Sequence, residues 1–225
     1  RVHPADKRAS YSDIIRHIKG ETPMYENEYR LKIHDGSYKW ILTRGKVVEW
    51  TNEGRAALML GVYTDITERK NTELISIRQQ AALHSLNEIA SLSAVDPDDQ
   101  LRRALSLGAR YLGLSNGIIS QINSDEYRIH VQFSAQGQRD MPAVSPLAKT
   151  YCSLTVNLQD VIAEDDIPAS SYRQHPAYLL TQIETYIGAP LWVGGEIYGT
   201  LCFNSRKTRH HQYDSLDQDF VRLLA

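Results

Sequence analysis

Two cysteines are the residues of this chain with the clearest capacity for chemistry. Cys152 and Cys202 carry all the thiols in its 225 residues. A cysteine reacts as its thiolate, and two cysteines that meet in space can act as a redox pair. Neither local sequence supplies the Lys, Arg or His neighbourhood that lowers a thiol pKa, so we expect small buried structural thiols. Two cysteines without a secretory signal predict reduced thiols rather than a disulfide scaffold.

An acidic cluster is the second group with possible chemistry. Residues 164–166 read Glu-Asp-Asp, and His175 follows nearby. Carboxylate oxygens are ligands that divalent cations accept. No spacing in the sequence matches a calcium loop or a zinc site, and no glycine-rich phosphate loop occurs. We therefore expect a solvated acidic loop and no metal.

The composition is that of a globular protein. Hydrophobic residues make up 42% and charged residues 23%, and the net charge of −2 provides no field to attract a phosphate backbone. The longest apolar run, residues 56–62, is far shorter than the roughly 20 residues that span a bilayer. The sequence thus predicts a cytoplasmic segment with no nucleic acid partner and no membrane contact. Since both ends look cut, we interpret it as a fragment of a longer protein.

The elements that must position these residues begin with a small helix and sheet unit. Apolar residues at helical spacing predict a helix over 4–19. Alternation from residue 28 to 33, a turn at 34–37 and a second strand at 38–43 predict an antiparallel hairpin. The continuous apolar run at 56–63 is typical of a central strand, so we expect it to be the most buried strand of this sheet.

A connector helix is expected over 68–94, with Thr67 as its N-cap, because no Gly or Pro interrupts that stretch. A heptad-like stripe favours pairing with a second copy, and the alternative is an ordinary amphipathic helix packed on its own domain. The stripe consists of Ile75, Gln79, Ala82, Leu86 and Ile89.

The remaining sequence predicts a second α+β unit. Asp96 and Pro97 mark a helix start, and Gly113 marks its end. The Gly194 and Gly195 pair predicts a tight turn between two strands. The other predicted elements are a hairpin at 118–122 and 127–133, a loop at 136–142, a short helix at 147–154, a strand at 160–163, helical turns at 178–183, strands at 185–193 and 196–204, and a final helix containing residues 216–224.

Motifs in the first 70 residues resemble the C-terminal half of a PAS domain. The most specific motif is the closing segment at 61–70, Gly-Val-Tyr-Thr-Asp-Ile-Thr-Glu-Arg-Lys. The other matching residues are His3 to Asp6, Glu28 to Arg30, Asp35, Gly36 and Trp40. The first strands and helices of that fold have no counterpart here, so the resemblance implies a partial PAS unit with an incomplete sheet.

Residues 81–225 resemble a GAF domain. The resemblance rests on residues 150–155, Thr-Tyr-Cys-Ser-Leu-Thr, and more specifically on 186–191, Tyr-Ile-Gly-Ala-Pro-Leu, leading to 198–203, Tyr-Gly-Thr-Leu-Cys-Phe. We therefore expect an α+β protein with antiparallel sheets flanked by helices. Its parts are a partial PAS unit at 1–70, a connector helix at 71–94 and a GAF domain at 95–225, whose start includes 81–94 in a longer definition.

The resemblance implies a non-catalytic sensory and relay segment of a bacterial signal-transduction protein. Its output domain, absent here, would be a histidine kinase or a cyclic-dinucleotide cyclase or phosphodiesterase. We expect a homodimer formed through the connector helix and a small ligand in the GAF pocket, with no cofactor identified. The ligand would lie between the sheet and residues 142–184, against Tyr151, Cys152, Thr155, Tyr172, His175 and Tyr178.

Other activities of GAF relatives fit the sequence less well. Bilin attachment usually needs His after the cysteine, and Ser153 follows Cys152 here. The signature of relatives that bind cyclic nucleotides is not found. The alternative function is a GAF-like thiol enzyme, such as a free methionine sulfoxide reductase, in which Cys152 and Cys202 form the redox pair.

Overall fold

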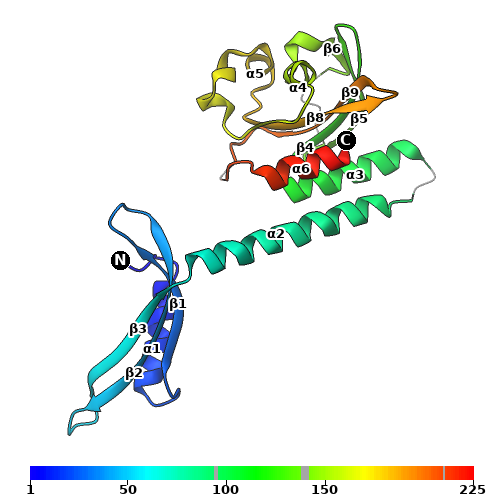
Figure 1. The fold of residues 1–225 in the computed structure, drawn as a ribbon. Helices are drawn as coiled ribbons and strands as arrows, with labels where there is room; N and C mark the ends of the chain where they lie inside the picture. The colour runs from blue at the N-terminus through cyan, green and yellow to red at the C-terminus, as the bar shows by residue number, and fades with distance from the viewer. Residues whose placement is uncertain (94–95, 138–141, 210) are drawn as a thin grey trace. The chain divides into compact units, whose positions relative to one another are not determined.

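The computed structural model describes residues 1–93, 96–137, 142–209 and 211–225. The chain divides into two compact units, Arg1–Arg78 and Gln79–Ala225 (Figure 1). The boundary between them falls inside helix α2, Thr67–Ala90. Each unit combines helices with an antiparallel sheet, which confirms the predicted α+β class.

The first unit is a three-stranded sheet with one helix packed on it. Helix α1 (Lys7–Ile18) precedes β1 (Tyr25–Lys32), β2 (Tyr38–Trp50) and β3 (Ala56–Asp65). The predicted helix and hairpin are confirmed. The buried residues of β1 and β2 lie at alternate positions along each strand, because every second side chain points to the same face of the sheet. They are Tyr25, Tyr29, Ile41, Thr43 and Val47.

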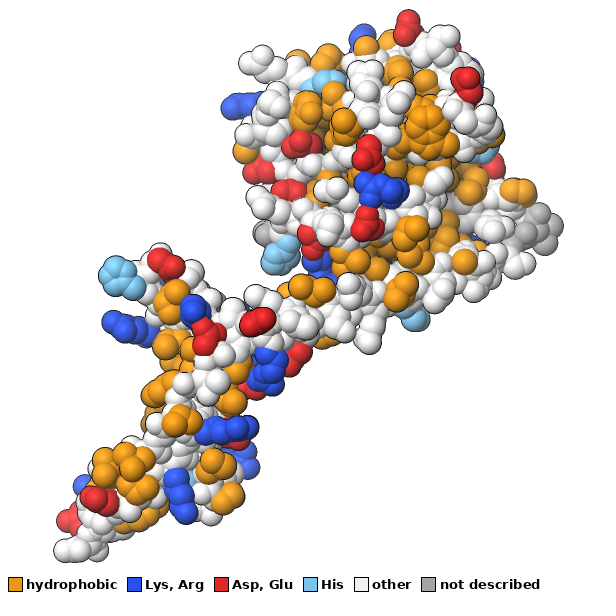
Figure 2. Space-filling model, in the orientation of Figure 1, with side chains coloured by type: hydrophobic (Ala, Val, Ile, Leu, Met, Phe, Trp, Pro, Cys, Tyr) orange, Lys and Arg blue, Asp and Glu red, His pale blue; other side chains and the backbone are white. Residues whose placement is uncertain are grey.

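The prediction that residues 56–63 form the central, most buried strand is wrong. The sheet order is β1-β2-β3, so β2 is central and β3 lies at an edge. Leu60 and Val62 of β3 are 60% and 62% exposed, and hydrophobic side chains reach the surface of this unit (Figure 2). Strands joined by short connections usually lie side by side. In a sheet of three consecutive strands, the second strand is therefore central whatever its composition.

The second unit is built on a six-stranded antiparallel sheet with the order β6-β5-β4-β9-β8-β7. Both predicted hairpins are confirmed, and Gly194 and Gly195 turn the β8–β9 hairpin with φ of +62° and +88°. Two glycines with positive φ suit the twist of a two-residue hairpin. The strands are β4 (Asn116–Asn123), β5 (Glu126–Ser134), β6 (Val144–Pro146), β7 (Ile162–Glu164), β8 (Thr185–Val193) and β9 (Glu196–Ser205).

Helices cover both faces of this sheet (Figure 1). Helices α3 (Pro97–Leu112) and α6 (Ser215–Leu224) lie on one face. The other face carries a layer of short helices, which we call the helical layer. It comprises η1 (Leu147–Lys149), α4 (Cys152–Leu158), η2 (Ile167–Ala169), η3 (Ser171–Gln174) and α5 (Pro176–Thr181).

The two faces of the sheet enclose separate cores. On β9, Leu201 and Phe203 point to one face while Cys202 points to the other. We call the first the hydrocarbon core; its buried members are Ala82, Leu105, Ala109, Leu112, Leu114, Val131, Val161, Ile187, Ala189, Leu201, Phe203, Phe220 and Val221. We call the second the tyrosine–cysteine core; its buried members are Ile118, Tyr127, Tyr151, Cys152, Ile167, Ala177, Ile183, Tyr186 and Cys202.

Helix α3 shows how closely the hydrocarbon core is packed. Its predicted ends are confirmed: the Asp96 carboxylate accepts a hydrogen bond from the Asp98 amide, and Gly113 ends the helix with φ of +69°. Gly108 lies against the ring of Phe203, where an added Cβ would be 2.6 Å from Cζ. Glycine at this position therefore allows the helix and the ring to approach.

Helix α2 contributes to the second unit through its C-terminal half. Ala82 is 4% exposed within the hydrocarbon core, and Leu86 is packed against it. The predicted heptad stripe is thus partly used inside the domain, as the amphipathic alternative expects. Leu74 and Ile75, in the N-terminal half, are more than half exposed.

The middle of the second unit differs in detail from its prediction. The short helix predicted at 147–154 is split into η1 and α4, and the strand predicted at 160–163 begins at Ile162. The loop predicted at 136–142 lies largely outside the described residues. Within the described ranges, no helix has the length and apolar character needed to cross a bilayer.

Candidate functional site

The candidate site lies where the helical layer meets the sheet. Cys152 is the first residue of α4, and Cys202, Tyr186 and Tyr127 come from β9, β8 and β5. Each of these four side chains is at most 3% exposed. Residues from four elements therefore converge on one buried position.

A chain of hydrogen bonds links these groups. The Tyr186 hydroxyl donates to Cys152 Sγ at 3.7 Å and lies 2.8 Å from Thr155 Oγ1. Because the tyrosine proton is directed to sulfur, Thr155 is the donor in the second bond. Cys152 Sγ lies 4.0 Å from Cys202 Sγ. The chain thus runs from threonine through tyrosine to two sulfur atoms.

Gly188 makes room for this arrangement. A Cβ at this position would lie 2.3 Å from the Tyr186 hydroxyl oxygen and 3.0 Å from Cys202 Cβ. Any other residue would displace the tyrosine ring from its place above the strand. The glycine of the Tyr-Ile-Gly-Ala-Pro-Leu motif therefore positions the hydroxyl that contacts Cys152.

The surroundings shift the two thiols in opposite directions. Hydrogen bonds from Cys202 above all, and then from Thr200, Tyr186 and Tyr127, lower the pKa of Cys152 from 9.0 to about 7, against the effect of burial. The hydrogen bond with Cys152 and burial raise the pKa of Cys202 well above 9.0. We looked for a Lys, Arg or His neighbourhood in the sequence, and the groups that lower the pKa of Cys152 are neutral donors instead.

All six predicted site residues lie in or against the tyrosine–cysteine core. Tyr151, Cys152 and Thr155 are buried, while Tyr172 and Tyr178 are partly buried at its margin. The His175 ring stacks on Tyr151 with centroids 5.4 Å apart. These side chains fill the space in which the resemblance places a ligand, and their role as ligand contacts stays a prediction.

Two buried tyrosines of this core, Tyr127 and Tyr186, were not among the predicted site residues. Both are nearly inaccessible to solvent. Tyr186 alternates along β8 with Ile187 of the opposite core, whereas Tyr127 and Val131 of β5 lie in opposite cores although they are four residues apart, and the β4–β5 pairing register shifts between Ile119 and Ser120. Strand alternation is the signal that could have assigned Tyr186 to the face of Cys202, but on β5 alternation would have grouped Tyr127 with Val131 of the other core. It does not show which strand positions lie opposite the short helices.

The acidic cluster has structural partners. The Asp166 carboxylate accepts from the Ala169 amide at the start of η2, and Asp165 accepts from the Tyr213 amide at 2.8 Å. Burial raises the pKa of Glu164. Among the described residues, no three His, Cys, Asp or Glu side chains gather as metal ligands would.

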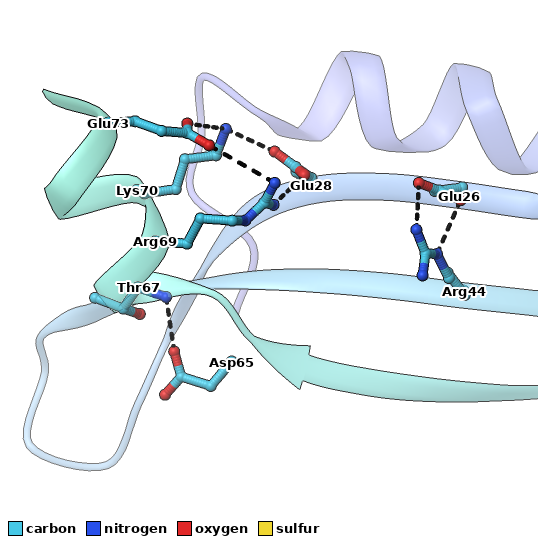
Figure 3. A network of polar contacts seen from close by, with 8 residues as sticks. All are labelled: Glu26, Glu28, Arg44, Asp65, Thr67, Arg69, Lys70 and Glu73. Atoms are coloured by element: carbon cyan, nitrogen blue, oxygen red, sulfur yellow. Dashed lines mark hydrogen bonds and ion pairs between the residues drawn. The ribbon is translucent and has the colours of Figure 1, made fainter. Parts of the chain in front are cut away.

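A second candidate lies in the first unit, where α2 begins (Figure 3). Glu28 of β1 forms ion pairs with Arg69 and Lys70, the latter at 2.7 Å. Glu73, one turn further along α2, also contacts Lys70 at 3.2 Å. We call Glu28, Arg69, Lys70 and Glu73 the helix anchor.

Hydrogen bonds between side chains and backbone amides fix the same helix end. The Asp65 carboxylate accepts from the Thr67 amide at 3.0 Å, while the Thr67 hydroxyl accepts from the Trp40 amide at 3.0 Å. The predicted helix start at Thr67 is confirmed, but the cap is supplied by Asp65. Thr67 instead joins the helix to β2.

The described chain consists of two small modules, each an antiparallel sheet with helices packed on it. The model of the GAF domain family matches residues 94–225, more than half of the chain, and the chain belongs to this family. The PAS fold model matches residues 1–63. The predicted partial PAS unit followed by a GAF domain is thereby confirmed, and the chain combines two kinds of sensory domain.

A curated relative links the chain to signal transduction. Hybrid signal transduction histidine kinase A of Dictyostelium discoideum is 31% identical over 133 residues, which cover 58% of this chain. The matched part spans 6% of the length of that relative. The similarity therefore concerns a small part of a much larger signalling protein.

Solved structures share the fold of the second unit. The free methionine-R-sulfoxide reductase of Neisseria meningitidis, in complex with its substrate, has a TM-score of 0.51 and 14% identity, covering 66% of this chain and 84% of that chain. The GAF domain of an Acinetobacter phosphoenolpyruvate-protein phosphotransferase has a TM-score of 0.50 and 11% identity, covering 66% and 87%. At such identities these neighbours show the fold alone.

Proposed function

We propose that this chain is a non-catalytic sensory and signal-relay segment of a larger signal-transduction protein. One observation carries the proposal: α2 is held at its start by the helix anchor and contributes Ala82 to the hydrocarbon core further along. A single helix thus belongs to both sensory units. A change of packing in either unit acts on that helix directly.

The relay works by shifting α2 between two arrangements. A signal that favours one packing of a unit shifts the population of helix positions, by rotation or by a change of register. The ion pairs of Glu28 are half-exposed and individually weak. Contacts of this strength can be exchanged during a signal without unfolding either unit.

The output domain that we favour is a histidine kinase. The support is the similarity to a hybrid histidine kinase over 58% of the chain. A cyclic-dinucleotide cyclase or phosphodiesterase is the other output that the sensory domains allow. Autophosphorylation of the full-length protein with radiolabelled ATP distinguishes these outputs.

A matched pair of substitutions in the full-length protein tests the relay. Glu28→Gln removes the charge that holds Arg69 and Lys70. The control is Glu26→Gln, two residues earlier on β1, which breaks a similar pair with Arg44 of β2 and touches no residue of the helix anchor. We expect Glu28→Gln to change the output activity by about fivefold or more, and Glu26→Gln to leave it nearly unchanged. Equal effects of the two substitutions would contradict the relay.

We also propose that the GAF unit binds a small ligand within the helical layer. His175 and Tyr178 are half-buried there, and their movement would open the position above Tyr151. Native mass spectrometry compared with the denatured mass detects a noncovalent ligand. A Tyr151→Ala, Tyr178→Ala chain that retained the same ligand would contradict this location.

We further propose that α2 pairs with a second copy of the chain. Ala82 is already buried in its own domain, so the pairing surface is the exposed N-terminal half around Leu74 and Ile75. Ile75→Glu is expected to weaken the dimer in sedimentation experiments. Ser76→Glu, about 100° away around the helix, is the control and should not. A monomeric parent chain would contradict the proposal.

The thiol-enzyme alternative is less well supported. The two sulfur atoms are in contact, but Cys152 and Cys202 are only 3% and 2% exposed. A substrate as large as methionine sulfoxide would have to displace core side chains before it reached either thiol. Turnover of free methionine sulfoxide by the wild-type chain, lost in a Cys152→Ser, Cys202→Ser chain, would reverse this preference.

A further inference from the structure

The two cysteines are brought together by the fold from distant parts of the chain. They are 50 residues apart in sequence, and their sulfur atoms lie 4.0 Å apart. Cys152 begins α4 in the helical layer, while Cys202 lies in β9 of the sheet. The contact therefore joins the two layers that enclose the tyrosine–cysteine core.

We propose that Cys152 and Cys202 form an intramolecular disulfide when a small hydroperoxide oxidises the folded chain, which makes this pair an oxidation site of the GAF domain. The proposal does not depend on the relay role of α2. It concerns a stoichiometric modification, distinct from turnover of an enzyme substrate.

The chemistry has two balanced steps. The Cys152 thiolate attacks one peroxide oxygen, the O–O bond breaks, and the other oxygen leaves and takes a proton to become water or an alcohol. Sulfur is oxidised by two electrons to a sulfenic acid, and the peroxide is reduced by the same two. The Cys202 sulfur then attacks the Cys152 sulfur, forms the S–S bond and expels the hydroxyl, which leaves as water with the Cys202 proton.

The surroundings assign different roles to the two residues. Hydrogen bonds lower the pKa of Cys152, so this thiol ionises more readily than that of Cys202. Cys202, whose pKa is raised, keeps its proton and donates it toward the Cys152 thiolate. Cys152 is thus the attacking residue, and Cys202 resolves the sulfenic acid.

Contact between the two sulfur atoms in the folded domain favours disulfide formation over further oxidation of the sulfenic acid. In an unfolded chain, bringing together residues 50 positions apart costs loop-closure entropy. In the folded domain that cost is already met, because the two sulfur atoms touch. A disulfide needs a separation of about 2.05 Å, so side-chain rotation and a small approach of α4 toward β9 complete the bond.

The helical layer provides the route for the oxidant. Both cysteines are buried, so peroxide must enter through local opening of the structure. The covering helices are short: α4 has 7 residues and α5 has 6. Such helices depend on tertiary packing for stability, so we place the opening in this layer.

Peroxide titration of the purified chain tests the proposal. After the reaction, remaining thiols are alkylated in denaturant and the peptides are mapped by mass spectrometry. We expect a linked Cys152 and Cys202 peptide that dithiothreitol reverses, and a reaction rate that rises with pH as Cys152 ionises. Persistence of both thiols, or links only between separate chains, would overturn the proposal.

Two single substitutions test the assigned roles. In Cys202→Ala, Cys152 should accumulate as sulfenic acid that a 1,3-diketone traps. In Cys152→Ala, Cys202 stays buried and keeps one stabilising donor, Tyr186, whereas Cys152 in Cys202→Ala keeps three, so Cys202 should react at least about tenfold more slowly than Cys152 does. Equal reactivity in the two variants would overturn the assignment. Circular dichroism checks that each variant folds, and the wild-type peptide map tests the disulfide even if a variant does not.

Discussion

The two faces of the GAF sheet differ in chemistry although the same strands build both. The buried residues of the hydrocarbon core carry no polar side-chain atoms, whereas the tyrosine–cysteine core contains three tyrosine hydroxyls and two thiols. Long helices cover the first face and short helices cover the second. Alternation along a strand thus allows one sheet to combine a stable core with a reactive one.

On each face of the sheet, a glycine makes room for an aromatic side chain. Gly108 of α3 leaves room for Phe203, and Gly188 of β8 leaves room for the Tyr186 hydroxyl. On the first face the result is close packing of hydrocarbon. On the second it is a hydroxyl placed against a sulfur atom. The comparison teaches that similar steric devices can support stability on one face and reactivity on the other.

The largest effect is expected from Phe203→Ala in the hydrocarbon core. Phe203 is fully buried, so its truncation leaves a cavity beneath α3 and should lower the free energy of unfolding by about 3–5 kcal/mol. Urea denaturation of the whole chain measures this loss. The peroxide reaction of Cys152 in the folded fraction should be unchanged, and a large change would break the separation of the two faces.

Gly188→Ala is expected to have the next largest effect. Its methyl group would collide with the Tyr186 hydroxyl and shift that ring, at a cost of about 1–3 kcal/mol. Because the shift moves a donor away from Cys152, the variant should also react more slowly with peroxide near neutral pH. A variant with normal stability and reactivity would contradict the positioning role of Gly188.

Tyr186→Phe separates the hydroxyl from the ring. Removing the hydroxyl leaves Thr155 without the acceptor it uses at 2.8 Å, which should destabilise the chain by about 1–2 kcal/mol. Loss of one donor to Cys152 should move the pH profile of its peroxide reaction upward. The Tyr186→Phe, Thr155→Val double variant should be more stable than Tyr186→Phe alone. Its pH profile should stay shifted by the same amount as that of Tyr186→Phe.

The smallest effect concerns pH and His175. Burial lowers the pKa of His175 below 6.5, and its Nδ1 accepts a hydrogen bond from the Ala177 amide. A depressed folded pKa means that this contribution to stability is present above pH 6.5 and is lost as the pH falls.

His175→Asn keeps an N-cap acceptor that does not titrate. The variant should therefore lose less stability than wild type between about pH 7 and about pH 5, as urea unfolding measures. Phe203→Ala, on the other face, should keep the pH dependence of the wild-type chain. Parallel pH profiles for wild type and His175→Asn would contradict the role of this cap.

The sequence predicted elements with local signals better than it predicted their neighbours. Asp96, Pro97 and Gly113 determine the ends of α3 through their own backbone chemistry, so they could be identified without the fold. The position of β3 depends on which strands lie beside it, and its apolar composition was misleading. Burial on two sides is a property of the assembled sheet.

The candidate site was predictable to a similar extent. Its location under the short helices followed from a resemblance, which drew attention to Tyr151, Cys152 and Thr155. Contact between Cys152 and Cys202 depends on how α4 is placed over β9, and no local pattern encodes that. The acidity of Cys152 was missed for the same reason, since its donors come from other strands.

The shared helix α2 affects how such domains can be exchanged between proteins. The family model begins at residue 94, yet Ala82 and Leu86 occupy the hydrocarbon core. A transplanted domain that started at the family boundary would lose these side chains and expose apolar surface of the hydrocarbon core. Recombination that preserves this domain must therefore take the second half of α2 with it. Because the core fixes the rotation of α2 about its axis, it also fixes the orientation in which a new upstream domain is joined to the helix.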